Sequence, residues 1–358
     1  MNRPVVLGAG PAGCAAAITL ARAGHAPHLL DRSTEVGGAL CGGFMSWRTA
    51  ERAKGLGVDL ASLGAQEVRR LRLFASGRCV EAPLPRPAWG LSRRVFDTAM
   101  RKAAVGEGAV FEECSVKSVD QRALATENGA IESEALFLAV GKHDVRGAGR
   151  PRTGSDPALG LRVRAAASPS LTALVGETIE LHLFDGGYAG IVLQEDGSAN
   201  ICLALRKSML AERGSPRGLL SACADRHPAF AERMAFVADD APIDAIAAVP
   251  YGYIADSTSA GVFRLGDQAA VIPSLAGEGM GIALASGAMA ADMYARYGAR
   301  GAAQYQSRFA KAARRPVRMA EALWHTGENP VGASAMAFLT RLLPGAADLA
   351  MRMTRIAA

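Results

Sequence analysis

The stretch "VVLGAGPAGCAAAITLARAGHAPHLLD", residues 5–31, decides the fold of this chain. It begins with the apolar run Val5–Leu7, which is typical of a short buried strand in a parallel sheet. A G-x-G-x-x-G pattern follows at once, and the small residues after it predict a helix from Pro11 to about Ala23. A second apolar run then ends in the acid Asp31. Strand, glycine turn, helix and strand in this order predict a βαβ unit that holds a dinucleotide.

Each residue of the glycine pattern has its own task in such a unit. Gly8 permits the tight turn, Gly10 lets a pyrophosphate approach the backbone, and Gly13 lets the helix pack closely on the strand. The start of the helix presents free N–H groups and the positive end of its dipole to the phosphates. Asp31 stands where a carboxylate binds the adenosine ribose, and Arg32 follows it. This segment alone is compatible with NAD and with FAD.

Length and composition set the class of protein. The chain has 358 residues, 50% of them hydrophobic, which is enough for two domains. Its formal net charge is +6, but the basic residues are scattered, so a nucleic-acid surface is disfavoured. An anionic ligand or an acidic membrane surface accounts for the excess charge equally well.

The cysteines and the N-terminus indicate the compartment. Six cysteines are widely spaced, with no C-x-x-C pair and no Cys/His cluster of metal-binding spacing, so no metal site is expected. The N-terminus runs straight into a predicted strand without the features of a signal peptide. No apolar segment reaches the roughly 20 residues needed to span a bilayer. These features predict a cytoplasmic protein with reduced thiols.

Two later segments carry further ligand-binding features. In "LSRRVFDTAMRKAA", residues 91–104, apolar residues recur at helical spacing, and Arg93 falls in the first turn, where a cation opposes the helix dipole. That position suits an arginine that grips a phosphate or a flavin edge. In residues 261–293 a strand ends in Gly266-Asp267, and a glycine-rich run ending at Gly281 opens a long helix. The acid can bind a polyol chain, and the helix start points N–H groups at a group that becomes negative.

The central part of the chain predicts strands. An apolar strand within residues 135–147 ends in Gly141, beside the expected dinucleotide. The alternating residues before it turn at Asn128-Gly129, which predicts a β-meander. Residues 178–205 predict two or three antiparallel strands that can wall a pocket.

Taken in order, these motifs resemble the FAD-dependent p-hydroxybenzoate-hydroxylase-like superfamily. "GGALCGGF" (residues 37–44) and "GGYAGIVLQEDGSANICLAL" (residues 186–205) are similar to its geranylgeranyl-reductase-like branch, and the resemblance covers roughly residues 1–295. It implies an α/β fold, with a Rossmann-like FAD-binding domain built on a central parallel sheet and an antiparallel-sheet substrate domain. We expect the FAD-binding domain in residues 1–60, 91–150 and 256–300, the substrate domain in residues 61–90 and 151–255, and C-terminal helices in residues 301–358.

The resemblance also implies which residues hold FAD. The pyrophosphate would lie on Gly8, Gly10, Ala12 and Gly13. The adenosine would lie against Asp31, Arg32 and Val116, and Arg93 would sit by the phosphate–ribityl region. Asp267 would bind the ribityl chain, and Gly279, Met280 and Gly281 would lie at the pyrimidine edge of the flavin. Gly141, next to the dinucleotide, and Ala39 complete the set of expected cofactor-binding residues. NAD(P)H can serve as a transient electron donor.

The chain departs from the family in two places. Aromatic hydroxylases usually carry an Asp-Gly pair after the strand that ends here in Gly141, whereas this chain has "GKHDVRG". Prenyl reductases usually have a Tyr-x-Trp-x-Phe-Pro signature, whereas this chain keeps Tyr188 and has Gly190 in place of the tryptophan. The second departure leaves more room near the flavin.

The substrate is expected to contact Cys41, Phe44, Trp47 and Tyr188, and no residue is assigned as catalytic acid or base. The C-terminal helices can cap an apolar tunnel or touch a membrane surface, but helices that simply cover the core are favoured. We therefore predict an FAD-dependent oxidoreductase of secondary metabolism that acts on a hydrophobic small molecule by monooxygenation or dehydrogenation. Flavin-dependent reduction of an isoprenoid double bond and a non-catalytic FAD-binding subunit are the alternatives.

Overall fold

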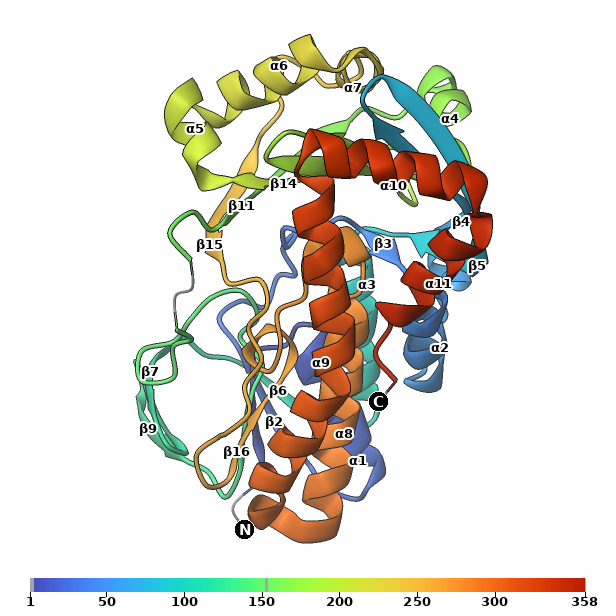
Figure 1. Cartoon of the computed structure of the whole chain (residues 1–358). Coiled ribbons are helices and arrows are strands. Elements are labelled where there is room, and N and C mark those ends of the chain that lie inside the picture. The colour runs from blue at the N-terminus through green and yellow to red at the C-terminus, as the bar shows by residue number, and fades with distance from the viewer. Residues whose placement is uncertain (1–2, 152–153, 358) are drawn as a thin grey trace.

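A computed structural model describes residues 3–151 and 154–357 of the chain (Figure 1). Its N-terminal unit is built on a parallel sheet of five short strands in the order β16-β10-β1-β2-β6. These strands are Val5–Leu7 (β1), His28–Asp31 (β2), Val110–Glu113 (β6), Leu136–Leu138 (β10) and Val262–Arg264 (β16). Both β1 and β10 are buried at every residue, as expected for strands covered on both faces. Because β16 pairs with β10, the sheet brings the chain around residue 265 to the glycine turn after β1.

Four long helices pack around this sheet: α1 (Pro11–Arg22), α3 (Arg93–Gly106), α8 (Gly279–Tyr297) and α9 (Ala302–Gly327). The predicted first helix is confirmed, with Pro11 in its first turn and Gly24 at a positive φ of 85° just beyond its end. A Cβ atom placed on Gly287 would lie 2.3 Å from the carbonyl oxygen of Ala12. The glycine therefore permits α8 to lie directly against α1. A separate small sheet, β7 (Val116–Asp120), β8 (Ala123–Thr126) and β9 (Gly129–Glu132), forms the expected meander.

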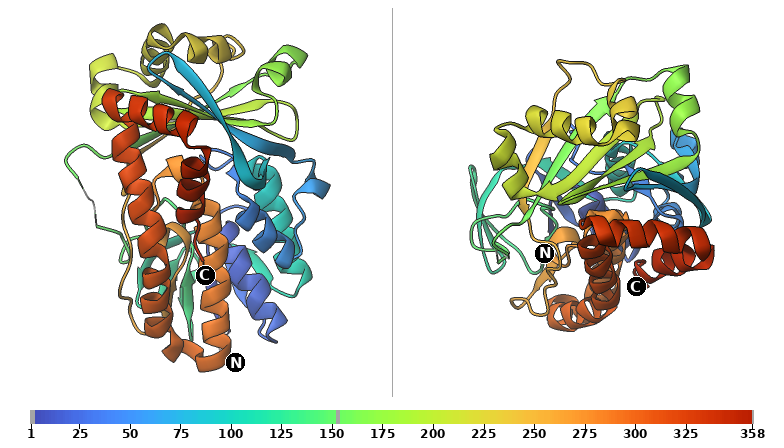
Figure 2. Two further views of the ribbon diagram at one scale, coloured as in Figure 1. Left: turned by 45° about the vertical axis from the view of Figure 1, so that its right-hand side comes forward. Right: turned by 45° about the horizontal axis from the view of Figure 1, so that its top comes forward.

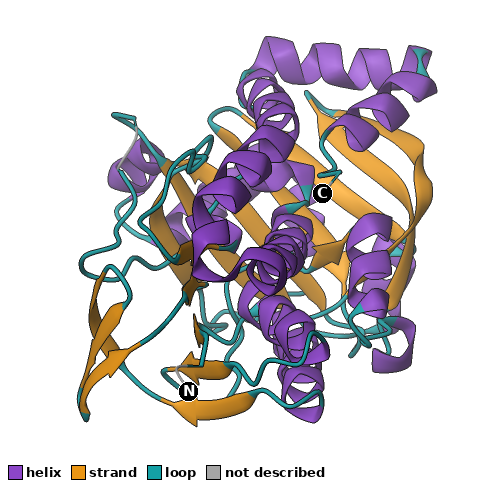
Figure 3. Cartoon of the chain, turned by 90° about the horizontal axis from the view of Figure 1, so that it is seen from below, coloured by secondary structure: helices purple, strands orange, loops and turns teal. Residues whose placement is uncertain are grey.

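The second unit is an eight-stranded, mostly antiparallel sheet that spans the far end of the molecule in Figure 3. Its order is β15-β11-β14-β13-β12-β4-β5-β3, and only β12 and β4 are paired in parallel. The strands are Phe44–Met45 (β3), Gln66–Ala75 (β4), Arg78–Gly90 (β5), Ala158–Ala165 (β11), Thr178–Phe184 (β12), Gly187–Leu193 (β13), Ala199–Arg206 (β14) and Asp244–Val249 (β15). The predicted α/β class, with a parallel sheet and a separate antiparallel sheet, is confirmed.

Short helices cover both faces of the large sheet. On its outer face lie α4 (Pro169–Val175), α5 (Lys207–Arg213), α6 (Pro216–Arg226) and α7 (Pro228–Met234), where Leu220 and Phe230 pack against strand residues such as Leu161. The remaining helices are α2 (Trp47–Gly55), α10 (Pro330–Leu342) and α11 (Pro344–Met353). As Figure 2 shows, α9 runs from the lower end of the molecule up to the large sheet, and α10 turns across the inner side of that sheet. Ala333 and Ala337 of α10 pack there against Leu183.

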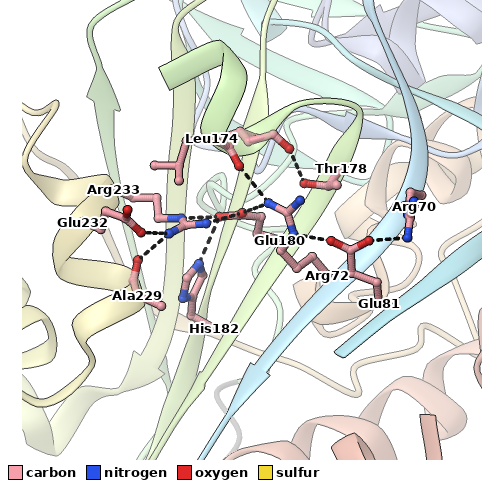
Figure 4. Close-up of polar contacts among 11 residues, drawn as sticks. Arg70, Arg72, Glu81, Leu174, Thr178, Glu180, His182, Ala229, Glu232 and Arg233 are labelled. Carbon is pink, nitrogen blue, oxygen red and sulfur yellow. Dashed lines mark hydrogen bonds and ion pairs between the residues drawn. The ribbon is translucent and has the colours of Figure 1, made fainter. Parts of the chain in front are cut away.

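A buried ionic network joins strands β4 and β5 to strand β12 and helix α7 (Figure 4). Glu180 on β12 is fully buried and accepts hydrogen bonds from Arg72 of β4 at 2.8 Å and from Arg233 of α7 at 2.8 and 2.9 Å. The Nε2 atom of His182 lies 3.2 Å from Oε2 of the same carboxylate. Glu81 of β5 accepts a hydrogen bond from Arg72. Since side chains alternate along a strand, these groups face away from the cavity that Ile179 and Leu181 line.

Candidate functional site

A cavity of about 1220 Å³ lies between the two sheets. One end is formed by the carboxyl ends of the parallel strands, where ligands bind in open α/β sheets. Gly8 follows β1, Asp31 ends β2, Gly141 follows β10 and Asp267 follows β16, and all four line the cavity. The other end is walled by the inner face of the eight-stranded sheet and by α10 and α11.

The glycine turn forms the floor of the first end. Gly8 has a φ of +105°, and a Cβ atom there would lie 2.4 Å from the carbonyl oxygen of Ala139. Gly13 lies underneath the turn, where a Cβ atom would be 1.8 Å from the oxygen of Gly8. At Gly10, by contrast, a Cβ atom would meet only Arg93, at 4.0 Å. Gly8, Gly10 and Ala12 line the cavity, and the space beside Gly10 is open, whereas Gly13 serves packing.

Asp31 is held beside this turn. Its Oδ2 atom accepts a hydrogen bond from the backbone N–H of Ala9 at 2.7 Å, and Arg101 lies 3.8 Å from the same oxygen. The carboxylate therefore braces the glycine turn while it faces the cavity. Arg32 and Val116 line the same end.

Arg93 points into the cavity from the first turn of α3, which begins after the N-cap Ser92. Its guanidinium makes two hydrogen bonds to Asp97, at 2.8 and 2.7 Å. This pairing on the same helix holds the guanidinium in a fixed position near Gly10. An arginine placed in this way can contact a phosphate without losing its partner.

Lys142 is a site residue that the sequence reasoning missed. Its Nζ atom lies 3.7 Å from Oδ2 of Asp267 and donates a hydrogen bond to the backbone oxygen of Leu40 at 3.3 Å. It therefore links the loop after β10 to the loop after β16. The signal was the charged residue directly after Gly141 in "GKHDVRG".

The start of α8 closes the middle of the cavity. Gly279 and Met280 line it, whereas Gly281 lies behind them, where a Cβ atom would be 2.4 Å from the Glu278 carboxylate. The backbone N–H groups of this first turn and the positive end of the helix dipole are oriented to stabilise negative charge.

Glu278, which precedes α8, is fully buried, and this burial raises its pKa while Arg355 and Arg52 act in the opposite direction. Ser46 donates a hydrogen bond to one of its oxygens at 3.0 Å, and the N–H of Ile356 donates to the other at 3.2 Å. Arg355 lies 3.3 Å from the same carboxylate and donates to the oxygen of Ala276 at 2.6 Å. The end of the chain is thereby fastened to the start of α8. No sequence signal pairs residues so far apart.

The second end of the cavity is apolar. It is lined by strand residues Leu71, Leu73, Leu84, Ile179 and Leu181, and by Leu323, Met336, Leu339 and Met351 from the C-terminal helices. Of the predicted substrate contacts, Cys41, Phe44 and Tyr188 line the cavity. Trp47 does not: it begins α2, is buried, and packs beneath the guanidinium of Arg355 at 5.1 Å. Its aromatic ring serves this packing contact, so the expectation that it lines the pocket is wrong.

Three hydroxyl groups meet where the apolar end reaches the loop before α8. Tyr188 on β13 donates a hydrogen bond to Ser274 at 2.8 Å, and the hydroxyl of Tyr251 lies 2.5 Å from the same oxygen. Burial raises the pKa of Tyr188 well above its usual value, and it raises the pKa of Tyr251 to about 12. Both tyrosines are therefore protonated at neutral pH. Only Tyr188 was predicted. Tyr251 lies in a segment without a motif, and Ser274 lies in the loop between Asp267 and α8, where no side chain was assigned a role.

This geometry fits the FAD that the motifs imply. The turn at Gly8–Gly13 and the acid Asp267 line one continuous cavity, although about 250 residues separate them. At Gly37, Gly42, Gly141 and Gly279, a Cβ atom would meet nothing within 4 Å, so the backbone is bare on the side of the cavity. Bare backbone, an arginine near the glycine turn and a helix N-terminus at the centre form a cradle for an extended dinucleotide. Ala39 also lines it.

Comparisons with known proteins agree with this geometry. Residues 5–146 match the family model described as FAD dependent oxidoreductase. Over 323 residues the chain is 29% identical to digeranylgeranylglycerophospholipid reductase 2 of Methanopyrus kandleri, a match that covers 81% of this chain and 76% of that protein.

Solved structures share the fold. A geranylgeranyl bacteriochlorophyll reductase-like protein from Thermoplasma acidophilum superposes with a TM-score of 0.70 at 17% identity, covering all of this chain and 94% of that one. The peptidyl tryptophan dihydroxylase QhpG, essential for tryptophylquinone cofactor biogenesis, superposes with a TM-score of 0.63 at 25% identity, covering 87% of this chain and 71% of that one. Together with the sequence matches, these structures confirm the resemblance that the motifs indicated.

Proposed function

We propose that this chain, an FAD-dependent oxidoreductase, acts on a hydrophobic small molecule and oxidises it by monooxygenation or dehydrogenation. We infer the substrate class from the apolar end of the cavity. Leucine and isoleucine side chains from β4, β5 and β12 form its wall, and Met336 and Leu339 of α10 lie opposite. Pockets lined in this way bind apolar ligands and use a few polar groups to orient them.

The cofactor supplies two-electron chemistry when it is bound. The turn at Gly8–Gly13 would hold its diphosphate, Asp31 its adenosine ribose and Asp267 its ribityl chain. The first turn of α8 would lie against the flavin ring, where its N–H groups stabilise negative charge. The chain itself then has to bind the substrate, orient it and control protons.

The hydroxyl group of Tyr188 is the polar group best placed to orient the substrate and to control protons. It is buried in the apolar end, and its raised pKa keeps its proton in place. Ser274 accepts from Tyr188 and also contacts Tyr251, so the three hydroxyls are connected by hydrogen bonds. We infer that this set orients the polar end of an otherwise apolar substrate and holds a proton there.

Gly190 favours a substrate with a bulky end. It lines the cavity two residues after Tyr188, and a Cβ atom there would lie 3.5 Å from the tyrosine ring. Where related prenyl reductases usually carry tryptophan, this chain leaves space beside the hydroxyl groups. The 25% identity with the dihydroxylase QhpG supports oxygenation of such a substrate.

Reduction of an isoprenoid double bond is the second candidate. The 29% identity with the digeranylgeranylglycerophospholipid reductase supports it, and so do two neutral tyrosines that can donate a proton. A reductase would require an external electron donor.

One set of flavin measurements separates the reactions. With NAD(P)H as donor, a monooxygenase consumes oxygen faster when hydrophobic substrate is present. A dehydrogenase loses its visible flavin absorbance when it is mixed anaerobically with substrate. A reductase does neither, but its prereduced flavin is reoxidised anaerobically by an unsaturated isoprenoid, and that result would replace our proposal with the second candidate.

Tyr188→Phe tests the role of the hydroxyl group. The substitution keeps the ring but removes the proton, so we expect the flavin half-reaction with substrate to slow about a hundredfold while the flavin content is unchanged. Tyr297→Phe is the matched control, because Tyr297 is an exposed tyrosine at the end of α8. Equal rates in the two variants would remove Tyr188 from the mechanism.

A further inference from the structure

The helix α10 carries its large apolar side chains outward. Val331, Phe338, Leu339 and Leu342 are 49–79% exposed, whereas the inward positions are the small residues Ala333, Ala337 and Thr340. Leu343 and Leu349, in and before α11, are also more than half exposed. Most of the exposed large apolar residues in the described part of the chain lie in this one segment. Water-facing apolar patches of this kind mark interaction surfaces.

The adjoining helix α9 presents a basic stripe. Arg308, Lys311, Arg314, Arg315 and Arg318 are all exposed and recur at helical spacing. From Ala302 to Ala320 the helix contains no acidic residue. In Figure 1, α9 and α10 follow one another along the side of the molecule turned to the viewer, with the sheets behind them. We call the outer residues of α9, α10 and α11 named here the docking face.

The cavity reaches the surface at the docking face. Leu339 lines the cavity and is 49% exposed, and Ala346, at the start of α11, lines the cavity and is exposed as well. An apolar path therefore runs from the outer side of α10 to the apolar end of the cavity, where Tyr188 lies.

We propose that the docking face binds the surface of an anionic lipid bilayer, with α10 and α11 in the acyl region and the basic stripe of α9 against the headgroups. Apolar residues beside a row of cations are complementary to such a surface, which offers hydrocarbon next to negative charge. A second copy of the chain would bring another row of five cations to the same place, so self-association through this face is disfavoured. Resting on the proposed function, the docking would let an apolar substrate enter from the lipid without crossing water.

Vesicle flotation of the flavin-loaded protein tests the docking. We expect it to bind vesicles of phosphatidylcholine with phosphatidylglycerol, to bind vesicles of phosphatidylcholine alone far more weakly, and to be released as salt is raised. Phe338→Ser/Leu342→Ser should weaken binding about tenfold or more through lost apolar burial. Arg314→Gln/Arg315→Gln should also weaken it about tenfold or more through lost headgroup attraction. None of these four side chains lines the cavity.

Matched controls make the test specific. Val105→Ser/Val110→Ser removes two exposed apolar groups elsewhere, and Arg94→Gln/Lys102→Gln removes two exposed cations on α3. Both should bind vesicles as the unchanged protein does. The proposal is overturned if the unchanged protein ignores anionic vesicles or if the controls lose binding equally. It is also overturned if light scattering shows a dimer that Phe338→Ser/Leu342→Ser dissociates in the absence of vesicle binding. Since no turnover is measured, failure here is separate from failure of the proposed reaction.

Discussion

At the scale of single residues, the acids of the candidate site also hold the backbone in place. Asp31 braces the glycine turn through the N–H of Ala9, and Asp267 is linked to the loop after β10 by Lys142. Asp31 also accepts a hydrogen bond at its other oxygen, from the backbone N–H of Ser33 at 3.4 Å. Both acids line the cavity.

Asp267→Ala tests whether this residue binds the cofactor. Removing a partly buried acceptor should weaken FAD binding roughly tenfold or more, because the proposed hydrogen bond to the ribityl chain would be lost. The ratio of flavin to protein absorbance after gel filtration measures this. Asp240→Ala, at an exposed position, should keep full flavin content. If Asp267→Ala keeps it too, the residue does not bind the cofactor.

At the scale of elements, the site depends on how closely α1 and α8 approach. Gly287 of α8 has no room for a side chain, since a Cβ atom would clash with the backbone of Ala12 in α1. This contact sets the position of the α8 N-terminus relative to the glycine turn. It thereby sets the distance between the two segments that we propose hold the cofactor.

Gly287→Ala should therefore lower the free energy of unfolding by about 1–3 kcal/mol, because α8 must shift away from α1 to make room for the methyl group. Gly106→Ala, at the end of α3, meets nothing within 4 Å and should leave stability unchanged or slightly higher. Urea unfolding followed by circular dichroism measures both. A Gly287→Ala protein as stable as the parent would show that the helices can separate freely.

At the scale of the whole molecule, the network around Glu180 joins β4 and β5 to the later strands and to α7 (Figure 4). Burial raises the pKa of Glu180, but hydrogen bonds from His182 and Arg233 outweigh it and bring the pKa down to about 2. Burial lowers the pKa of His182 below its usual value of 6.5. Both groups therefore take up protons more readily in the unfolded chain than in the folded one.

The stability of the molecule should consequently fall with acid in two stages. Below pH 6.5 the unfolded chain protonates His182 while the folded one resists, and below about 4.5 the same holds for Glu180 until the pH nears 2. Glu180→Gln should lower stability at pH 7 by about 3 kcal/mol, because the buried Arg233 and the half-buried Arg72 each lose one of their carboxylate partners. The substitution should also make the free energy of unfolding depend less steeply on pH below pH 4.5. Urea unfolding at several pH values measures both, and an unchanged slope in the variant would exclude Glu180 as its source.

Local patterns were sufficient to predict the βαβ unit, the meander, the strands within residues 178–205, and the glycines and acids at the end of the cavity formed by the parallel strands. Glycine spacing, a cap residue or an alternation of side chains acts within one or two elements, so the sequence shows it directly. The same patterns placed Trp47 in the pocket. The sequence around an aromatic residue near a glycine loop is the same whether its ring contacts a ligand or packs against an arginine.

Other features were decided only by the tertiary structure. Glu278 meets Arg355, and Tyr188 meets Ser274 and Tyr251, through contacts between segments that no periodicity relates. The apolar spacing of α10 predicts a helix, but it does not say which side faces water. That depends on the shape of the sheet beneath, which accepts alanines and leaves the larger residues outside.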